Sequence, residues 1–221
     1  DLVGHPSTTT CSFTTYAVPG TARLAAVPVA SGEAVATWSA PNNLGGGVTG
    51  YEVELLNGTT VLRSTTVPAT DRTLTWTALS NGVTYDVRVR AINPAGSGPW
   101  STRTVTPSPV VTIAADGTGA VVEGNTGTRP LAFTVSIDRP SVLPVTVTVA
   151  TRNGTASAND YTASTTTVTI PAGSLTAPTS VNVVGDRRVE PNETFVVRIS
   201  APVNARRSTV FDATGTITND D

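Results

Sequence analysis

Lysine and methionine are absent from the 221-residue chain, and its formal net charge is only -2. Because arginine is the only strong base and no basic patch stands out, neither nucleic acid nor an anionic membrane is an expected partner. No run approaches the roughly 18 apolar residues that a membrane-spanning helix requires, and the first residues lack the features of a signal peptide. We therefore expect a mature product or a segment cut from a larger protein.

Histidine and cysteine occur once each, as His5 and Cys11. A single thiol cannot form an internal disulfide, and a single histidine near the start cannot complete a Ser-His-Asp or Cys-His arrangement in the later segments. Asp186 and Glu190 are a formal carboxylate pair for glycoside hydrolysis, but they fall in one turn with no aromatic subsite around them. The sequence therefore predicts a protein that is not an enzyme.

Alternating apolar and polar residues, the pattern of half-buried strands, recur along the chain, and no stretch shows helical spacing. The clearest alternating stretches are 51–55, 85–90 and 145–149. Turn sequences separate runs of about five to eight residues, as in all-β sandwiches. These turn sequences are Asn57-Gly58, Asn81-Gly82, Asn153-Gly154 and Pro171-Ala172-Gly173. We predict an all-β fold of two tandem Ig-like antiparallel β-sandwiches.

Two prolines in Thr106-Pro107-Ser108-Pro109 remove backbone donors and stiffen the chain between strand-like runs. We therefore place a short Pro-rich linker at 107–109, between domains at 19–106 and 110–221 that each have a common domain size. Residues 1–18 precede the pattern of the first domain but are compatible with a strand. We expect them to form an N-terminal arm or the end of a preceding module.

The first domain carries aromatic and turn motifs over nearly its whole length. These motifs are Trp38-Ser39-Ala40-Pro41, Gly50-Tyr51-Glu52-Val53, Leu79 to Asn93 and Ala95 to Ser101. The segment resembles a fibronectin type III domain. The resemblance implies that Trp38 and Tyr51 fill the core from facing sheets and that Tyr85 pins a crossover between them. It further implies a spacer, or a recognition surface on loops such as 42–47 and 93–100.

Acidic residues of the last hundred positions fall mostly in or next to turns, as do Glu123, Asp160, Asp186 and Glu190. In an antiparallel sandwich of seven strands A to G, the A-B, C-D and E-F turns and the end of strand G share one pole, because the chain reverses at every strand. The C-terminal Asp220-Asp221 would then meet these carboxylates. A cluster of hard oxygen ligands without His or Cys is typical of a Ca²⁺ site.

The second domain also carries ordered motifs from its first strand to its end. They are Val122 to Asn125, Thr151 to Ala156, Asn159 to Tyr161, Ile170 to Gly173, Gly185 to Phe195 and Gly215 to Asp221. Residues 110–221 resemble a Calx-beta domain, a family that is similar to the calcium-sensing domains of sodium-calcium exchangers and whose bacterial members are often extracellular repeats. The calcium ligands that the resemblance implies are Glu123, Asp186, Glu190, Asp220, Asp221 and, through its carbonyl, Arg188.

Several positions depart from the acid-rich version of this family. Asn153, a further candidate ligand, stands where the best binders have Asp, and Gly185 and Asn219 replace further carboxylates. Arg187 and Arg188 add positive charge where the exchangers have acid. Because fewer anionic ligands weaken binding, we expect a weak site that holds one ion and that millimolar extracellular calcium could fill.

The acidic residues also have an interpretation without a metal. Asp160 would cap its own loop beside a core tyrosine, and Asp186 would neutralise a neighbouring arginine across a solvated turn. Asp220-Asp221 would then belong to a linker that leads to a following domain. The sequence leaves both interpretations open.

Together these patterns predict a non-catalytic structural or adhesive module of a secreted, multi-domain bacterial protein, extracellular or on the cell surface. Alternatives are the spacer or carbohydrate-contacting accessory region of a large secreted enzyme, and a decoration protein of a phage or appendage. Expected partners are other protein modules, copies of the same chain and surface glycans. The arm before Pro19 would form a homo-oligomer by pairing with the sheet edge of another copy. Sequons occur at Asn57, Asn153 and Asn192, but the Asn-Gly-Thr of the first two is also a plain turn sequence.

Overall fold

The computed structural model describes residues 15–221, and these residues form strands joined by turns and loops, without a helix. It therefore has, in the described range, no helix long and apolar enough to cross a membrane. His5, Cys11 and most of the expected N-terminal arm lie outside the described residues. Contacts divide the chain into two compact units, one reaching up to Val27 and adding Val35–Leu74 and Tyr85–Thr104, the other made of Pro28–Ala34, Thr75–Thr84 and Val105–Asp221.

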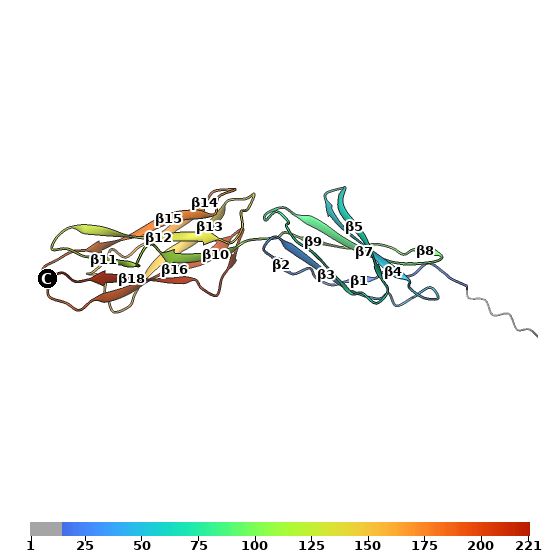
Figure 1. Cartoon of the computed structure of the whole chain (residues 1–221), viewed down its shortest axis with the longest axis horizontal. Helices are drawn as coiled ribbons and strands as arrows, with labels where there is room; N and C mark the ends of the chain where they lie inside the picture. Colours follow the sequence, from blue (N-terminus) through green and yellow to red (C-terminus); the bar gives the residue numbers. More distant parts are fainter. Residues whose placement is uncertain (1–14) are drawn as a thin grey trace, which may run out of the picture. The chain divides into compact units, whose positions relative to one another are not determined.

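Strands β1 to β9 form the sheets of the first sandwich (Figure 1). Their bounds are β1 Arg23–Leu24, β2 Val29–Ala30, β3 Glu33–Ser39, β4 Gly50–Asn57, β5 Thr60–Pro68, β6 Thr73–Trp76, β7 Tyr85–Asn93, β8 Gly96–Ser97 and β9 Ser101–Val105. One sheet has the order β1-β3-β2, with β6 also pairing with β3. The other has the order β5-β4-β7-β8, with β9 also pairing with β7.

Aromatic residues fill the first core as the resemblance implies. Every second residue of β7 is buried, and Tyr85 is buried at the start of this strand. Trp38 from one sheet meets Tyr51 from the other with ring centroids 5.6 Å apart. Both side chains are almost completely buried, so the expectation that they fill the core from facing sheets is confirmed.

Strands β10 to β18 form the second sandwich (Figure 1). Their bounds are β10 Val110–Ala115, β11 Ala120–Val122, β12 Thr128–Ile137, β13 Val145–Asn153, β14 Thr165–Ile170, β15 Thr176–Val184, β16 Glu193–Val203, β17 Arg206–Arg207 and β18 Asp212–Thr218. One sheet has the order β15-β12-β10-β17 and the other the order β11-β18-β16-β13-β14. The predicted all-β fold with two tandem sandwiches is confirmed.

Apolar residues at alternate positions of the facing strands make up the second core. Phe195 lies at its centre, edge-on to Phe133 at 6.1 Å and stacked on Tyr161 at 4.7 Å between ring centroids. Strand β13 buries its valines and turns Thr146 and Thr148 away from the core. This one-sided burial gives each strand of the sandwich an inward register that can be followed to the strand's end.

Two pairings of the second sandwich differ from the antiparallel pattern that the sequence predicts, since β10 runs parallel to β17 and β11 runs parallel to β18. Strand β10 pairs antiparallel with β12, and the chain then crosses to the other sheet, where β11 lies beside β18. Gly117 and Gly119, both with positive φ, form the connection between β10 and β11. Parallel strands end at the same side of a sheet, so the residues that follow β11 and β18 emerge together.

Candidate metal centre

The ends of β11 and β18 bring the acidic C-terminus beside Glu123. The backbone amide of Glu123 donates to the carbonyl of Thr218 at 3.1 Å, which extends the ladder by one residue. The next amide, that of Gly124, donates to the Asp220 carboxylate at 2.9 Å. The side-chain amide of Asn125 donates to Asp221. The last residues of the chain are therefore held against the segment that follows β11.

At the end of the second sandwich, the strand positions that continue the inward-facing alternation beyond the last apolar residue carry polar side chains. Glu123 follows the inward Val121 by two positions, and Glu193 precedes the inward Phe195 by two. Asn153 continues the register of the inward valines of β13, and Asn219 that of Ile217. The end of the sandwich is thus closed by oxygen-bearing side chains rather than by apolar ones.

Glu123 is the most deeply buried of these acidic groups, with only 4% of its surface exposed. Its Oε1 atom has no hydrogen-bond partner among the described residues. Burial raises the pKa of Glu123, and repulsion from four other carboxylates raises it further. Those four are the predicted ligands Asp186, Glu190, Asp220 and Asp221. The other four acidic residues that the sequence predicts as ligands therefore all lie close enough to act on Glu123.

The loop between β15 and β16 carries two of these carboxylates, and Arg188 connects them. Its backbone amide donates to Asp186 at 2.7 Å, and its Nη1 lies 3.0 Å from Oε1 of Glu190. The carbonyl of Arg188, the additional ligand implied by the resemblance, accepts a hydrogen bond from the Asn219 side chain at 2.8 Å. Arg188 thus contacts the candidate site through its amide, its carbonyl and its guanidinium.

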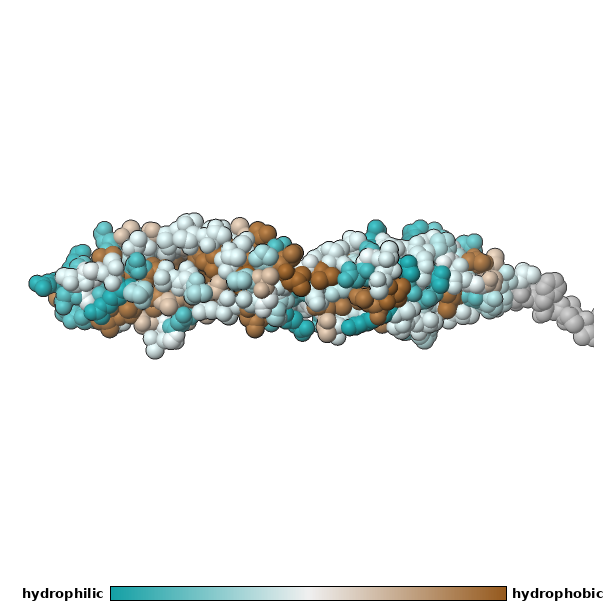
Figure 2. Space-filling model, turned by 90° about the horizontal axis from the view of Figure 1, so that it is seen from above, coloured by the Kyte–Doolittle hydropathy of each residue, from teal (hydrophilic) through white to brown (hydrophobic). Residues whose placement is uncertain are grey.

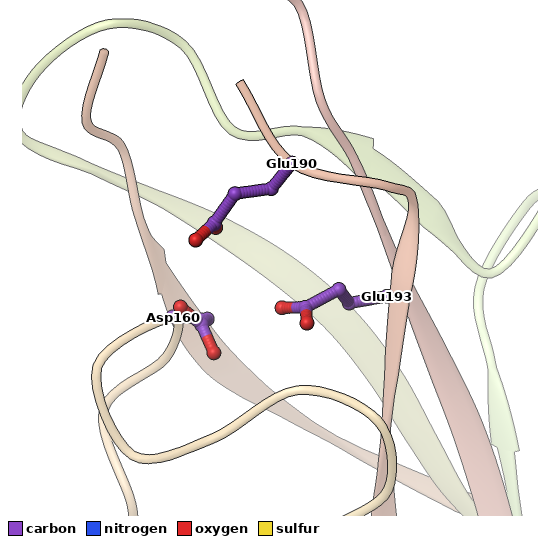
Figure 3. A group of neighbouring side chains, drawn as sticks. All are labelled: Asp160, Glu190 and Glu193. Carbon is purple, nitrogen blue, oxygen red and sulfur yellow. The ribbon is translucent and has the colours of Figure 1, made fainter. Parts of the chain in front are cut away.

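Two further acidic residues approach Glu190 from other elements. Oxygen atoms of Asp160, Glu190 and Glu193 lie within 4.8 Å of one another, and Figure 3 shows the three side chains pointing toward a common space. Burial raises the pKa of Glu193, and repulsion and a side-chain hydrogen bond from Asp160 raise it further. A cation in this space would relieve that repulsion. Glu190 links this group to Glu123.

We define the acidic pole as this end of the second sandwich and its seven carboxylates, which belong to Glu123, Asp160, Asp186, Glu190, Glu193, Asp220 and Asp221. Hydrophilic residues gather at the end that carries the C-terminus in Figure 2. The sequence predicts that Asp160 converges with the other acidic residues but does not include it among the calcium ligands. Glu193 is in neither predicted set. The signal for Glu193 is its register, since it shares the inward face of β16 with Phe195.

Asp160 also has the capping role that the sequence predicts for it. Its carboxylate accepts hydrogen bonds from the backbone amide of Ser157 at 2.6 Å and from the hydroxyl of that residue at 2.9 Å. The neighbouring Tyr161 is buried in the core and donates its hydroxyl to Oδ1 of Asn153 at 2.5 Å. That amide oxygen of Asn153, the further candidate ligand, is thus already engaged with the tyrosine.

The donor set fits a hard divalent cation. It consists of carboxylates and backbone carbonyls, which Ca²⁺ prefers. Residues 110–221 contain neither His nor Cys. The unpartnered Oε1 of the buried Glu123 supplies an acceptor that a cation would satisfy. The residues of the acidic pole that would hold the ion are therefore Glu123 together with the acidic residues that raise its pKa.

Family models match both sandwiches, in the order that the sequence predicts. The model described as a fibronectin type III domain matches residues 18–107, and the model described as a Calx-beta domain matches residues 125–221. The predicted limits of the domains and of the linker at 107–109 stay predictions.

Endoglucanase B of Cellulomonas fimi is 35% identical to this chain over 144 residues, which cover 58% of this chain and 13% of that protein. The match thus spans a small part of the relative. A solved segment of two fibronectin type III domains from chicken tenascin covers 90% of this chain and 98% of its own length, at 13% identity and a TM-score of 0.50. The apo-form Calx CBD1 domain covers 52% of this chain and 99% of its own, at 23% identity and a TM-score of 0.43.

Proposed function

This chain is a fibronectin type III domain followed by a Calx-beta domain, and from that premise we propose that it is a non-catalytic extracellular module with a structural or adhesive role, whose acidic pole binds Ca²⁺. The observation that carries the calcium proposal is Glu123, whose Oε1 is unpartnered and whose pKa is raised first by burial and then by four neighbouring carboxylates. A buried charge without a partner costs free energy, and a bound cation would offset that cost.

The connectivity of the pole supports a stabilising role for the ion. Its carboxylates come from four separate segments: the residues after β11, the turn before Tyr161, the loop between β15 and β16 that leads into Glu193, and the end of β18. An ion coordinated by several of them would tie these segments together and lower the flexibility of this end of the domain. We expect weak affinity, because Asn153, Gly185 and Asn219 stand where the acid-rich version has carboxylates.

Calorimetric titration of Ca²⁺ into the wild type and into an Asp186→Ala plus Asp220→Ala variant tests this proposal. We expect a dissociation constant on the order of 1 mM for the wild type, in the range of extracellular modules, and no saturable heat for the variant. An Asp71→Ala plus Asp86→Ala variant, which removes two carboxylates from the first domain, should bind as the wild type does. No heat from the wild type at millimolar calcium would refute the calcium proposal.

A second candidate function is the accessory region of a large secreted enzyme. The observation that favours it is the match to an endoglucanase of which this chain spans 13%. Because fold alone does not determine function, the domains encoded in the same reading frame distinguish the two roles. A catalytic domain in the same reading frame would support the accessory role, and further repeats with an anchor signal would support adhesion. Retention of the chain on insoluble cellulose would identify a carbohydrate-contacting region.

A further inference from the structure

We infer that Arg188 is a tethered cation that competes with Ca²⁺ for the acidic pole and thereby sets its affinity. This inference rests on the proposed calcium binding and adds a regulatory residue to it. Its basis is the ion pair of Arg188 with Glu190, the carboxylate that lies between the Glu123 group and the pair formed by Asp160 and Glu193. The guanidinium therefore sits against the carboxylate that both parts of the pole share.

Among the arginines of the second sandwich, all of them in the described range, Arg188 is the one that forms an ion pair with a carboxylate of the pole. Arg129 also reaches this end, but it donates to the carbonyl of Val122 instead. The guanidinium of Arg188 also lowers the pKa of Glu193, against the burial and repulsion that raise it. In the cation-free protein, Arg188 thus supplies part of the positive charge that a metal ion would bring.

Exposure makes this guanidinium displaceable. The side chain of Arg188 is 77% exposed, whereas that of Glu190 is 18% exposed. Exposed ion pairs contribute little to stability, so the arginine can leave Glu190 at a small cost. A cation that binds Glu190 must displace the guanidinium or remain beside it. In either case, the affinity of the pole for the ion is lower than it would be without that charge.

The main chain of the same residue also contacts the pole. The Arg188 carbonyl accepts a hydrogen bond from the side-chain amide of Asn219, and its second lone pair remains available to a cation. An Arg188→Ala substitution removes the side chain beyond Cβ, including the guanidinium, and keeps the backbone carbonyl. The substitution therefore separates the competing charge from the backbone ligand that the resemblance implies.

Coulomb's law sets the size of the expected effect. One unit charge held ~6 Å from a divalent ion in a water-like dielectric changes the affinity about tenfold. We therefore expect Arg188→Ala to bind Ca²⁺ about tenfold more tightly than the wild type in calorimetry at low ionic strength. The difference should shrink on the order of threefold or more in ~1 M salt, where exposed charges are screened.

Two further variants test whether the charge of Arg188 and its position are both required. Arg188→Lys keeps the charge and should keep the weak affinity of the wild type. Arg187→Ala removes an equal charge from the neighbouring exposed position, which has no ion pair with Glu190, and should change the affinity by less than about threefold. A gain confined to Arg188→Ala would then be specific to the paired guanidinium.

The outcomes distinguish this inference from the calcium proposal on which it rests. Equal affinity of the wild type and Arg188→Ala, or weaker binding by the variant, would overturn the competing role of Arg188 and leave calcium binding in place. An equal gain for Arg187→Ala would also overturn it, since the effect would then be one of net charge. If neither the wild type nor any variant takes up Ca²⁺, the calcium proposal and this inference fail together.

Discussion

Burial makes ionised Glu123 costly in the folded protein, because this carboxylate is the one in the acidic pole that is almost completely removed from solvent. We predict that Glu123→Gln, which keeps the shape and removes the charge, raises the stability of the calcium-free protein at neutral pH by about 1 kcal/mol, because an unpartnered buried charge is lost. The same substitution should abolish stabilisation by Ca²⁺. Thermal unfolding with a chelator and with millimolar calcium measures both effects.

The matched control for this variant is Glu33→Gln at the start of β3, which removes one carboxylate outside the pole. Its stability should respond to calcium as that of the wild type does. If Glu123→Gln destabilised the calcium-free protein and still responded to calcium, the carboxylate would be needed for folding and would not be the ligand.

Turn positions and the family resemblance predict five of the seven acidic residues of the pole as ligands, and that role stays a prediction. Glu193 is missing from the predicted set because Pro191-Asn192-Glu193 is typical of a turn, whereas its inward direction follows from the register of β16. The pairing of Arg188 with Glu190 rather than with Asp186 depends on side-chain geometry that spacing does not encode. Asn153 is a ligand candidate by position, but its amide oxygen accepts the hydroxyl of Tyr161.

Packing between elements decides what residue 185 can be. The sequence suggests that Gly185 merely lacks a carboxylate, but a Cβ there would lie 2.0 Å from the carbonyl oxygen of Gly124 and 2.7 Å from that of Glu123. We predict that Gly185→Asp lowers the stability of the protein by about 2 kcal/mol or more, because the segment after β11 must move away. Chemical denaturation measures the loss.

Asn219→Asp is the matched control, since it adds the same acid at the end of β18 without a backbone overlap. It loses the hydrogen bond to the Arg188 carbonyl, so a smaller loss of about 1 kcal/mol is expected without calcium. With calcium, we expect Asn219→Asp to gain stability and Gly185→Asp not to recover. Equal behaviour of the two variants would mean that the close approach of Gly185 to the Glu123 segment has no energetic consequence.

Strand existence follows from the alternating pattern, but the pairing of the short strands does not. Strands such as β7 and β13 are long enough for the period of two to identify both the strand and its buried face. Strand β11 has only three residues, and its parallel pairing with β18 depends on the crossing that Gly117 and Gly119 permit. That crossing is what places Glu123 next to the C-terminal acids.

The stability of the whole molecule depends on pH through two kinds of carboxylate, whose contributions have opposite signs. Glu123 and Glu193 have a pKa raised above the ordinary value of 4.5, so their stabilising contribution is present in acid and is lost as the pH rises through their folded pKa values. Asp212, paired with Arg198, has a pKa lowered from 3.8, so its contribution is lost as the pH falls through its folded pKa.

These opposite signs predict how calcium and pH combine. Without calcium, the acidic pole lowers the stability of the second domain as the pH rises from about 4.5 toward neutrality, because Glu123 and Glu193 then ionise at the cost of desolvation and repulsion. Ca²⁺ binds the ionised form, so its stabilising effect should be largest near neutral pH and vanish near pH 4, where protons compete for the same oxygens. Melting temperatures measured with and without millimolar calcium across this range give the difference directly. A calcium-induced shift as large at pH 4 as at pH 7 would exclude these carboxylates as the ligands.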